Sequence, residues 1–156
     1  MTRWVYVSLV LAVLALGASV CVFHFDYNQL PEKIPTHWNI RGEVDKYTLK
    51  QDAWLHFYAL PGLLFFWVFV TWVLPKISPK QFSVDSFMGT YGYTMALVSG
   101  LFAYIHGVLL WNMLHPAVGF TKPFSIGFFL FFALLGNVLG KTRKNFWMGV
   151  RTPWTL

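Results

Sequence analysis

The chain has 156 residues, of which 56% are hydrophobic and 12% are charged, whereas soluble domains carry about 25% charged residues. This composition excludes an ordinary soluble domain, and the length leaves room for a single bundle of helices. The net charge of +6 does not indicate nucleic-acid binding, because the basic residues lie outside the long apolar runs. We therefore expect an all-α integral membrane protein whose immediate partner is the lipid bilayer.

Four apolar runs are each long enough to cross a bilayer, which takes about 20 residues. They span residues 4–25, 53–75, 87–114 and 123–140, and none of them carries a formal charge. The first run exceeds the 7–15 apolar residues of a signal-peptide core, so we interpret it as a retained helix. The sequence therefore predicts one membrane domain, 1–156, with four transmembrane helices and an ordered outer loop at 26–52.

The charged residues between these runs predict how the helices are oriented. One side carries seven basic residues and one acidic residue, and the other side carries five of each. The side with the basic excess holds Arg3, Lys76, Lys80, Asp85, Lys141, Arg143, Lys144 and Arg151. Because cytoplasmic segments of membrane proteins are enriched in Lys and Arg, we expect both termini in the cytoplasm and the loop 26–52 outside.

Small and polar residues inside the runs predict where the helices touch. Gly136 and Gly140 form a GxxxG pair, and a second stripe of small residues follows one face of the third run. Such positions allow close approach of helices in a membrane. The second stripe consists of Ser99, Ala103 and Gly107. His106 lies in the middle of the third run, and we expect it to contact another helix rather than to relay protons.

The loop 26–52 has the features of an ordered element rather than a simple connection. Pro31 and Pro35 favour extended backbone in this segment, and Gly42 permits the positive φ that a turn needs. We expect the loop to pack over the outer ends of the first two helices and to gather its candidate binding residues in one cluster. These residues are His37, Trp38, Asn39, Gly42 and Asp45.

Two segments together resemble a known family. Leu30 to Tyr47 follows the pattern LPxxIPxHWNxxGxxDxY, and Gly136 to Leu156 contains GN followed by NxxxGxRTPWTL. Both patterns resemble signatures of the Sdp immunity-protein family of bacterial multi-pass membrane proteins. The resemblance implies a place in the bacterial cytoplasmic (inner) membrane and immunity to a secreted, membrane-active peptide toxin. In some members it also implies capture of a cytoplasmic repressor.

The resemblance implies that larger members continue past the second signature into further helices. We therefore expect this chain to be either a truncated piece or a naturally short relative. The segment 141–156 combines basic and aromatic residues, which fits an interfacial anchor, and its Arg-Thr-Pro-Trp order also fits a docking surface for a cytoplasmic partner. Both interpretations stay open. The candidate binding residues here are Asn145, Gly149, Arg151, Pro153 and Trp154.

The sequence gives little support for catalysis. It contains no GxSxG nucleophile motif and no glycine-rich phosphate-binding loop. Histidines near the outer face lack the tight spacing of a zinc motif, so we expect no metal or other cofactor, and His37 is the first ligand expected if a metal binds. These outer histidines are His24, His37, His56 and His115.

We therefore predict a non-enzymatic membrane protein of Sdp-immunity type. It would protect against a membrane-active peptide toxin, signal by binding a cytoplasmic regulator, or do both. The first alternative is a small accessory subunit of a larger membrane complex, and the second is a metal-dependent membrane enzyme.

Overall fold

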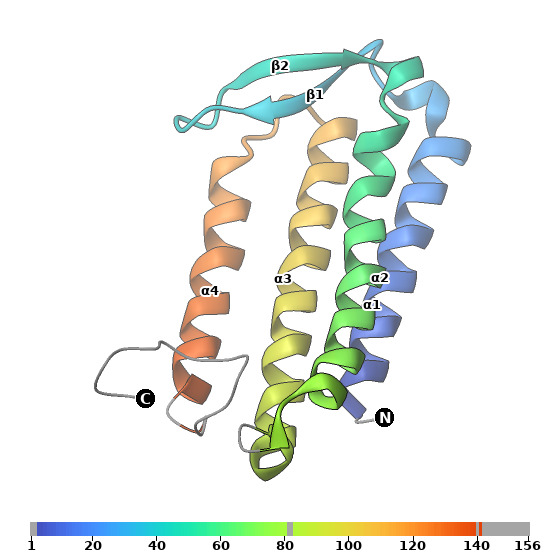
Figure 1. The fold of residues 1–156 in the computed structure, drawn as a ribbon. Coiled ribbons are helices and arrows are strands. Elements are labelled where there is room, and N and C mark those ends of the chain that lie inside the picture. Colours follow the sequence, from blue (N-terminus) through green and yellow to red (C-terminus); the bar gives the residue numbers. More distant parts are fainter. Residues whose placement is uncertain (1–2, 81–82, 140, 142–156) are drawn as a thin grey trace.

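The computed structural model describes residues 3–80, 83–139 and 141. Within this part of the chain, four long helices stand side by side, and a two-stranded hairpin lies across one end of the bundle (Figure 1). Each of the four is long and apolar enough to cross a membrane, so the predicted fold class is confirmed. The candidate spans are Arg3–Phe25, Lys50–Ile77, Asp85–Leu114 and Thr121–Val138.

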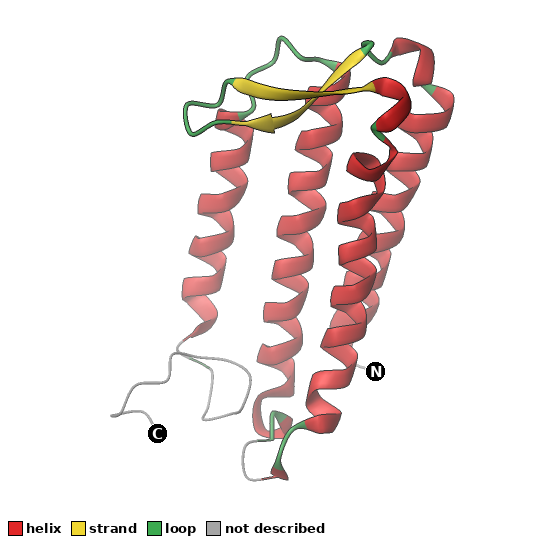
Figure 2. Ribbon diagram, turned by 45° about the horizontal axis from the view of Figure 1, so that its top comes forward, coloured by secondary structure: helices red, strands yellow, loops and turns green. Residues whose placement is uncertain are grey.

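The elements follow one another as helix, hairpin and three further helices. In chain order they are α1 (Arg3–Val20), the π-helical turn η1 (Cys21–Phe25), the 3-10 turn η2 (Tyr27–Gln29), β1 (Lys33–Trp38), β2 (Val44–Leu49), the 3-10 turn η3 (Lys50–Asp52), α2 (Trp54–Ile77), the 3-10 turn η5 (Asp85–Phe87), α3 (Met88–Leu114) and α4 (Thr121–Leu139). Helices α1, α2 and α3 pack against one another, whereas α4 packs mainly against α3. Helix α4 accordingly stands at the edge of the bundle in Figures 1 and 2.

Helix α4 is the least enclosed of the four helices. Only 6% of its most apolar stretch is buried, compared with 28–33% for the other three. Its outward side chains are nevertheless apolar, as expected for a helix surrounded by lipid, where apolar side chains need no protein partner. The position of α4 is therefore set by few contacts, most of them with α3 and with the hairpin described below.

A buried apolar cluster joins the hairpin to the helices beneath it. Ile34 of β1 is fully buried, and Leu30 just before it is nearly so. Both belong to the same cluster as Phe57 of α2 and Leu110 and Met113 of α3. Burying such side chains stabilises the structure by about 1.5–3 kcal/mol each where water is excluded. The hairpin is thus fixed to the bundle at its base.

Two prolines inside α2 account for two of the polar contacts between helices. Pro61 has no N–H, so it cannot donate to the carbonyl of Phe57 one turn earlier. The hydroxyl of Ser19 from α1 donates to that carbonyl instead, at 2.6 Å. Ser19 Oγ also lies 2.8 Å from His106 Nε2 of α3, and because its single proton is already used, the histidine is the donor. The expected contact of His106 with another helix is confirmed.

The second proline of α2 is compensated in the same way. Pro75 leaves the carbonyl of Thr71 without its helical donor, and the hydroxyl of Tyr91 from α3 donates to that carbonyl at 2.9 Å. The hydrocarbon core offers no water that could hydrogen-bond to an unpaired carbonyl. A side chain of a neighbouring helix therefore supplies the donor that each proline lacks. These two bonds fix α2 against α1 near the hairpin and against α3 near the other end.

The small-residue predictions have a mixed outcome. Ala103 packs against a cluster shared by α1 and α2, as expected. The contact expected at Gly136 is wrong within the described residues, because nothing lies within 4 Å of where a Cβ would be; Gly140 lies outside them. The close approach of α3 and α4 occurs at Gly127, where an added Cβ would lie 2.1 Å from the Tyr104 ring.

Candidate functional site

The segment 26–52 folds as an antiparallel hairpin of β1 and β2. Lys33 pairs with Leu49 at its base and Trp38 pairs with Val44 near its tip, with an irregularity in register between Pro35 and His37. Such an irregularity bends and twists a strand. The sequence analysis predicted the extended geometry and the order of this loop, but it did not predict the strand pairing.

His37 and Asp45 face each other across the two strands. His37 Nδ1 lies 2.5 Å from a carboxylate oxygen of Asp45, so the predicted proximity of these two residues is confirmed. Their side chains are 64% and 43% exposed, and exposed ion pairs add little to stability. The pair therefore orients two polar side chains on the open surface of the hairpin, where a ligand can reach them.

The tip of the hairpin is built around Asn39 and Gly42. The Asn39 side chain accepts the backbone N–H of Arg41 at 2.8 Å and of Glu43 at 3.0 Å, and it donates to the Glu43 carboxylate at 2.9 Å. Gly42 adopts a φ of 79°, which only glycine adopts without strain. This arrangement suits a short hairpin loop that closes on a left-handed residue, and it confirms the turn predicted at Gly42.

The tip also touches α4, which the sequence analysis did not predict. The Trp38 ring stacks on Phe120, with centroids 4.5 Å apart and planes inclined by 17°. A Cβ added to Gly42 would lie 1.6 Å from Thr121 Oγ1, so the turn rests directly on the first residue of α4. The loop packs over the ends of the first two helices as expected, because Ile34 shares a buried cluster with Val22 and Phe57. The hairpin also extends further, across α3 to the start of α4 (Figures 1 and 2).

A ladder of aromatic rings continues from this contact along α4. Phe120 stacks on Phe124 at 5.2 Å, and Phe124 stacks on Phe128 at 5.7 Å. Phe128 then meets Phe132 edge to face at 4.9 Å. Residues four apart share one face of a helix, so these rings follow α4 away from the hairpin. The ladder joins Trp38 to an aromatic face of α4.

A second contact holds the base of the hairpin. Lys50 Nζ lies 3.1 Å from a Glu32 carboxylate oxygen, and the lysine side chain is only 13% exposed. The same ammonium group donates to the Leu30 carbonyl at 3.4 Å and lies 4.8 Å from the centre of the Tyr27 ring. Cation–π and ionic contacts together hold a lysine more firmly than either does alone. The hairpin is thus anchored at both its base and its tip.

The hairpin exposes both apolar and basic side chains. Ile40 at the tip is fully exposed, and Tyr47 and Leu49 of β2 are also exposed. Arg41 and Lys46 are exposed on the same element. These apolar residues are not among the candidate binding residues predicted from the sequence, and a single exposed hydrophobic side chain is common in proteins. Ile40 lies at the tip between the strands, and Tyr47 and Leu49 occupy alternate positions of β2.

The outer histidines do not converge in the structure. His24 Nε2 lies 3.0 Å from the Tyr58 hydroxyl, and the His115 ring stacks on Trp111 at 4.1 Å. The described part of the chain contains no group of three or more His, Cys, Asp or Glu side chains that could hold a metal. The candidate residues Asn145, Gly149, Arg151, Pro153 and Trp154 lie outside the described residues.

Comparison with known proteins adds a match over part of the chain. Residues 10–65 match the family model described as "Domain of unknown function (DUF1648)". This range covers most of α1, the whole hairpin and the first half of α2, so it contains every candidate residue of the outer loop. No curated protein and no solved structure matches the chain.

Proposed function

We propose that this chain is a non-enzymatic membrane protein of Sdp-immunity type. In this proposal the hairpin binds a membrane-active peptide toxin outside the cell, and α4 carries the effect of binding to the segment 141–156 on the cytoplasmic side. The observation that carries the proposal is the contact of the hairpin tip with α4 through Trp38, Phe120, Gly42 and Thr121. It joins a surface open to ligands to α4, the helix that comes directly before the segment 141–156 in the sequence.

The exposed side chains of the hairpin suit an amphipathic peptide. Ile40, Tyr47 and Leu49 offer apolar contacts, and Arg41 and Lys46 offer charge beside them. β1 and β2 form a two-stranded sheet in the described part of the chain, so each strand has one edge available for pairing. An extended peptide can add to such an edge by backbone hydrogen bonds, with side chains giving specificity.

Weak packing of α4 supports the signalling step. A two-state element can transmit binding only if its alternative positions differ by a few kcal/mol, and a helix with few buried contacts meets that condition better than an enclosed one. Helix α4 is the least buried span and packs mainly against α3. A shift of the hairpin would therefore move α4 before it moves the other helices.

The charge distribution supplies the orientation for this proposal. α1 begins and α4 ends at the end of the bundle opposite the hairpin (Figure 1). The sequence places its whole basic excess in segments that belong to that end, and the positive-inside rule assigns such segments to the cytoplasm. The proposed site is the bacterial cytoplasmic membrane, with the hairpin outside.

Replacing Trp38 with leucine tests this function. Leucine keeps an apolar side chain but removes the stack on Phe120, and such aromatic pairs are worth about 0.5–1.5 kcal/mol. We expect a sensitive host exposed to an Sdp-type peptide toxin to survive with the wild-type chain and to lose protection with Trp38→Leu, at equal membrane levels.

The matched control is Trp54→Leu, because Trp54 is an exposed tryptophan on α2 that takes no part in the contact with α4. This variant should protect as well as the wild type does. Absence of protection by the wild-type chain would contradict the proposed function itself. Full protection by Trp38→Leu would contradict only the role of the contact with α4.

A second candidate function, an accessory subunit of a larger membrane complex, is favoured by the outer surface of α4. Ile126, Phe129 and Leu130 of this helix are all exposed, and such a face can pack against a helix of another protein as well as against lipid. Identification by mass spectrometry of proteins that co-purify in mild detergent distinguishes the two functions. A large complex recovered in fixed stoichiometry would favour the accessory subunit.

A further inference from the structure

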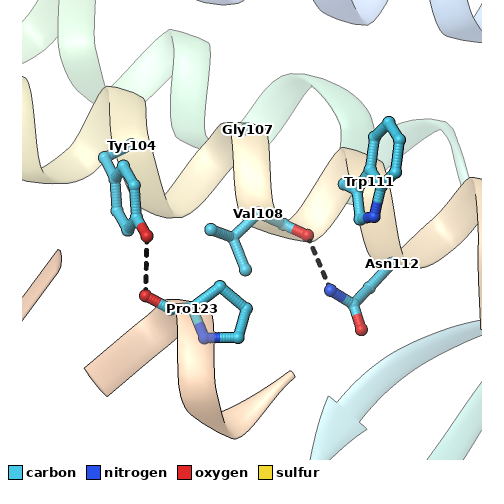
Figure 3. Close-up of a pocket in the computed structure, with 6 residues that line it drawn as sticks. All are labelled: Tyr104, Gly107, Val108, Trp111, Asn112 and Pro123. Atoms are coloured by element: carbon cyan, nitrogen blue, oxygen red, sulfur yellow. Dashed lines mark hydrogen bonds between the residues drawn. The ribbon is translucent and has the colours of Figure 1, made fainter. Parts of the chain in front are cut away.

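A pocket of about 350 Å³ lies between α3 and α4, on the hairpin side of the Tyr104–Gly127 contact (Figure 3). Its size falls in the usual range for small-molecule sites, about 300–1,000 Å³. The residues that line it are Tyr104, Gly107, Val108, Trp111, Asn112 and Pro123. The hairpin residues singled out above do not line this pocket.

Two polar groups of the lining bond within the protein, and the surface that the lining exposes to the pocket is apolar. The Tyr104 hydroxyl donates to the Pro123 carbonyl at 2.7 Å, and the Asn112 amide donates to the Val108 carbonyl at 3.0 Å; both bonds appear in Figure 3. The rest of the surface is formed by apolar side chains and by Gly107. A polar ligand would find few free partners here, whereas an apolar chain needs none.

The depth of the pocket matches the upper part of a lipid chain. α3 ends at Leu114, so residues 104–112 lie about 3–15 Å from that end of the helix at 1.5 Å per residue. Trp111 marks a typical border position, since tryptophan favours the headgroup region. The pocket therefore begins near the border and continues towards the hydrocarbon.

A cationic residue lies at the start of α4, the end from which Pro123 lines the pocket. Lys122 is exposed and directly precedes Pro123, which lines the pocket. An ammonium group at the headgroup level binds phosphate readily as a point charge. The apolar cavity and the adjacent cation are complementary to the two parts of an anionic phospholipid.

We propose that this pocket binds one acyl chain of an anionic phospholipid, with the lipid phosphate held by Lys122. The acyl chain fills the space beside Gly107 that neither helix fills. It thereby supports the spacing of α3 and α4 near the contact with the hairpin. This site is independent of the proposed function, because it requires no peptide toxin and uses none of the hairpin residues.

Photo-crosslinking in nanodiscs tests the site. The probe is phosphatidylglycerol with a diazirine in one acyl chain, and the labelled peptides are mapped by mass spectrometry. We expect the label to concentrate on the peptides that contain residues 104–112 and 123. Label spread evenly over exposed α4 positions such as Ile126, Phe129 and Leu130 would overturn the proposal, since it would indicate annular lipid only.

Gly107→Leu is the blocking variant. Gly107 lines the pocket, and a Cβ there would meet nothing within 4 Å, so the position has room for the start of a side chain. We expect pocket labelling to fall about tenfold, as for binding weakened by ~1.4 kcal/mol. Gly100→Leu is the matched control on α3, because its Cβ also meets nothing within 4 Å, and it should label like the wild type. Unchanged labelling in a folded Gly107→Leu protein would overturn the proposal.

The headgroup is tested with the same method. Lys122→Gln should remove the preference for phosphatidylglycerol over phosphatidylcholine carrying the same diazirine chain, while label on the pocket persists. Equal labelling by the two lipids in the wild-type protein would overturn the assignment of the phosphate to Lys122. Circular dichroism and size-exclusion profiles that match the wild type show that each variant is folded.

Discussion

Ser19→Ala is expected to lower the free energy of unfolding by about 1–2 kcal/mol. The substitution removes the side-chain hydroxyl that donates to the Phe57 carbonyl, which Pro61 leaves without its helical partner. It also removes the acceptor for His106 Nε2. Leaving a buried polar group unpaired costs about 1–3 kcal/mol, although interhelical bonds measured in membranes average about 0.6 kcal/mol. Reversible unfolding in mixed detergent micelles measures the change.

A double-mutant cycle with Pro61→Ala isolates the part of the stability loss that comes from the unpaired Phe57 carbonyl. Alanine at position 61 restores a backbone N–H that can donate to Phe57, so Ser19→Ala should cost less in that background. The remaining cost belongs to His106, which loses its contact with Ser19 in either case. Coupling between the two positions is the quantity of interest, because such cycles cancel effects that each substitution has alone.

Ser99→Ala is the matched control for Ser19→Ala. Ser99 is equally buried, but its hydroxyl donates to the Met95 carbonyl of its own helix at 3.1 Å. That carbonyl is one turn away on the same helix. Removal of the Ser99 hydroxyl should therefore change the free energy of unfolding by less than about 0.5 kcal/mol. Additive effects of Ser19→Ala and Pro61→Ala would contradict the role assigned to the proline.

Gly42→Ala is expected to release the tip of the hairpin from α4. Alanine in the left-handed conformation costs about 1–2 kcal/mol, and its Cβ would overlap Thr121 Oγ1. The Thr121 Cβ is also only 3.0 Å away, so rotation of the threonine side chain cannot clear the space fully. We expect amide hydrogen exchange of β1 and β2 to accelerate about tenfold, the equivalent of ~1.4 kcal/mol.

Two variants separate the sources of this effect. Gly42→Ala combined with Thr121→Ala removes the hydroxyl overlap but keeps the backbone strain, so exchange should slow only partly. Gly119→Ala serves as the control, because an added Cβ there meets nothing within 4 Å and no left-handed φ is involved. Unaltered exchange in Gly42→Ala would mean that the tip does not depend on its contact with α4.

The sequence predicts the helices well because the membrane restricts what can cross it. Runs of apolar residues with no charge can satisfy their backbone only as helices, and this holds without knowledge of any neighbour. The boundaries moved by only a few residues: the second predicted run, 53–75, corresponds to α2 at Trp54–Ile77. Glycine at position 42 was equally informative, since a positive φ is a local property.

Contacts between distant segments could be predicted only in part. The prolines of α2 indicate that the Phe57 and Thr71 carbonyls need donors, but nothing in the sequence identifies Ser19 and Tyr91 as those donors. The stacking of Trp38 on Phe120 joins residues more than eighty positions apart. It depends on strand pairing, on the reach of the hairpin and on the start of α4, none of which leaves a periodic pattern.

The hairpin residues show the same difference between local features, which the sequence predicts, and contacts between distant residues, which it does not. Proline and glycine spacing predicted that His37 and Asp45 would meet, and they do. The contribution of Ile40 and Tyr47 to the exposed surface was missed, because a single apolar residue carries no signal until its neighbours are known. The roles of these side chains in binding stay a prediction, as do those of Arg151 and Trp154 in the segment 141–156.

The most direct test of the account is whether toxin on the hairpin side alters the segment beyond α4. A single cysteine at Thr142, in a Cys21→Ala background, is labelled in inverted membrane vesicles by an impermeant thiol reagent, with and without an Sdp-type peptide toxin enclosed. We predict labelling in inverted vesicles but not in intact cells, at a rate that the toxin changes in the wild type and not in Trp38→Leu. Labelling from outside intact cells, or a rate that the toxin leaves unchanged in the otherwise wild-type chain, would contradict the account.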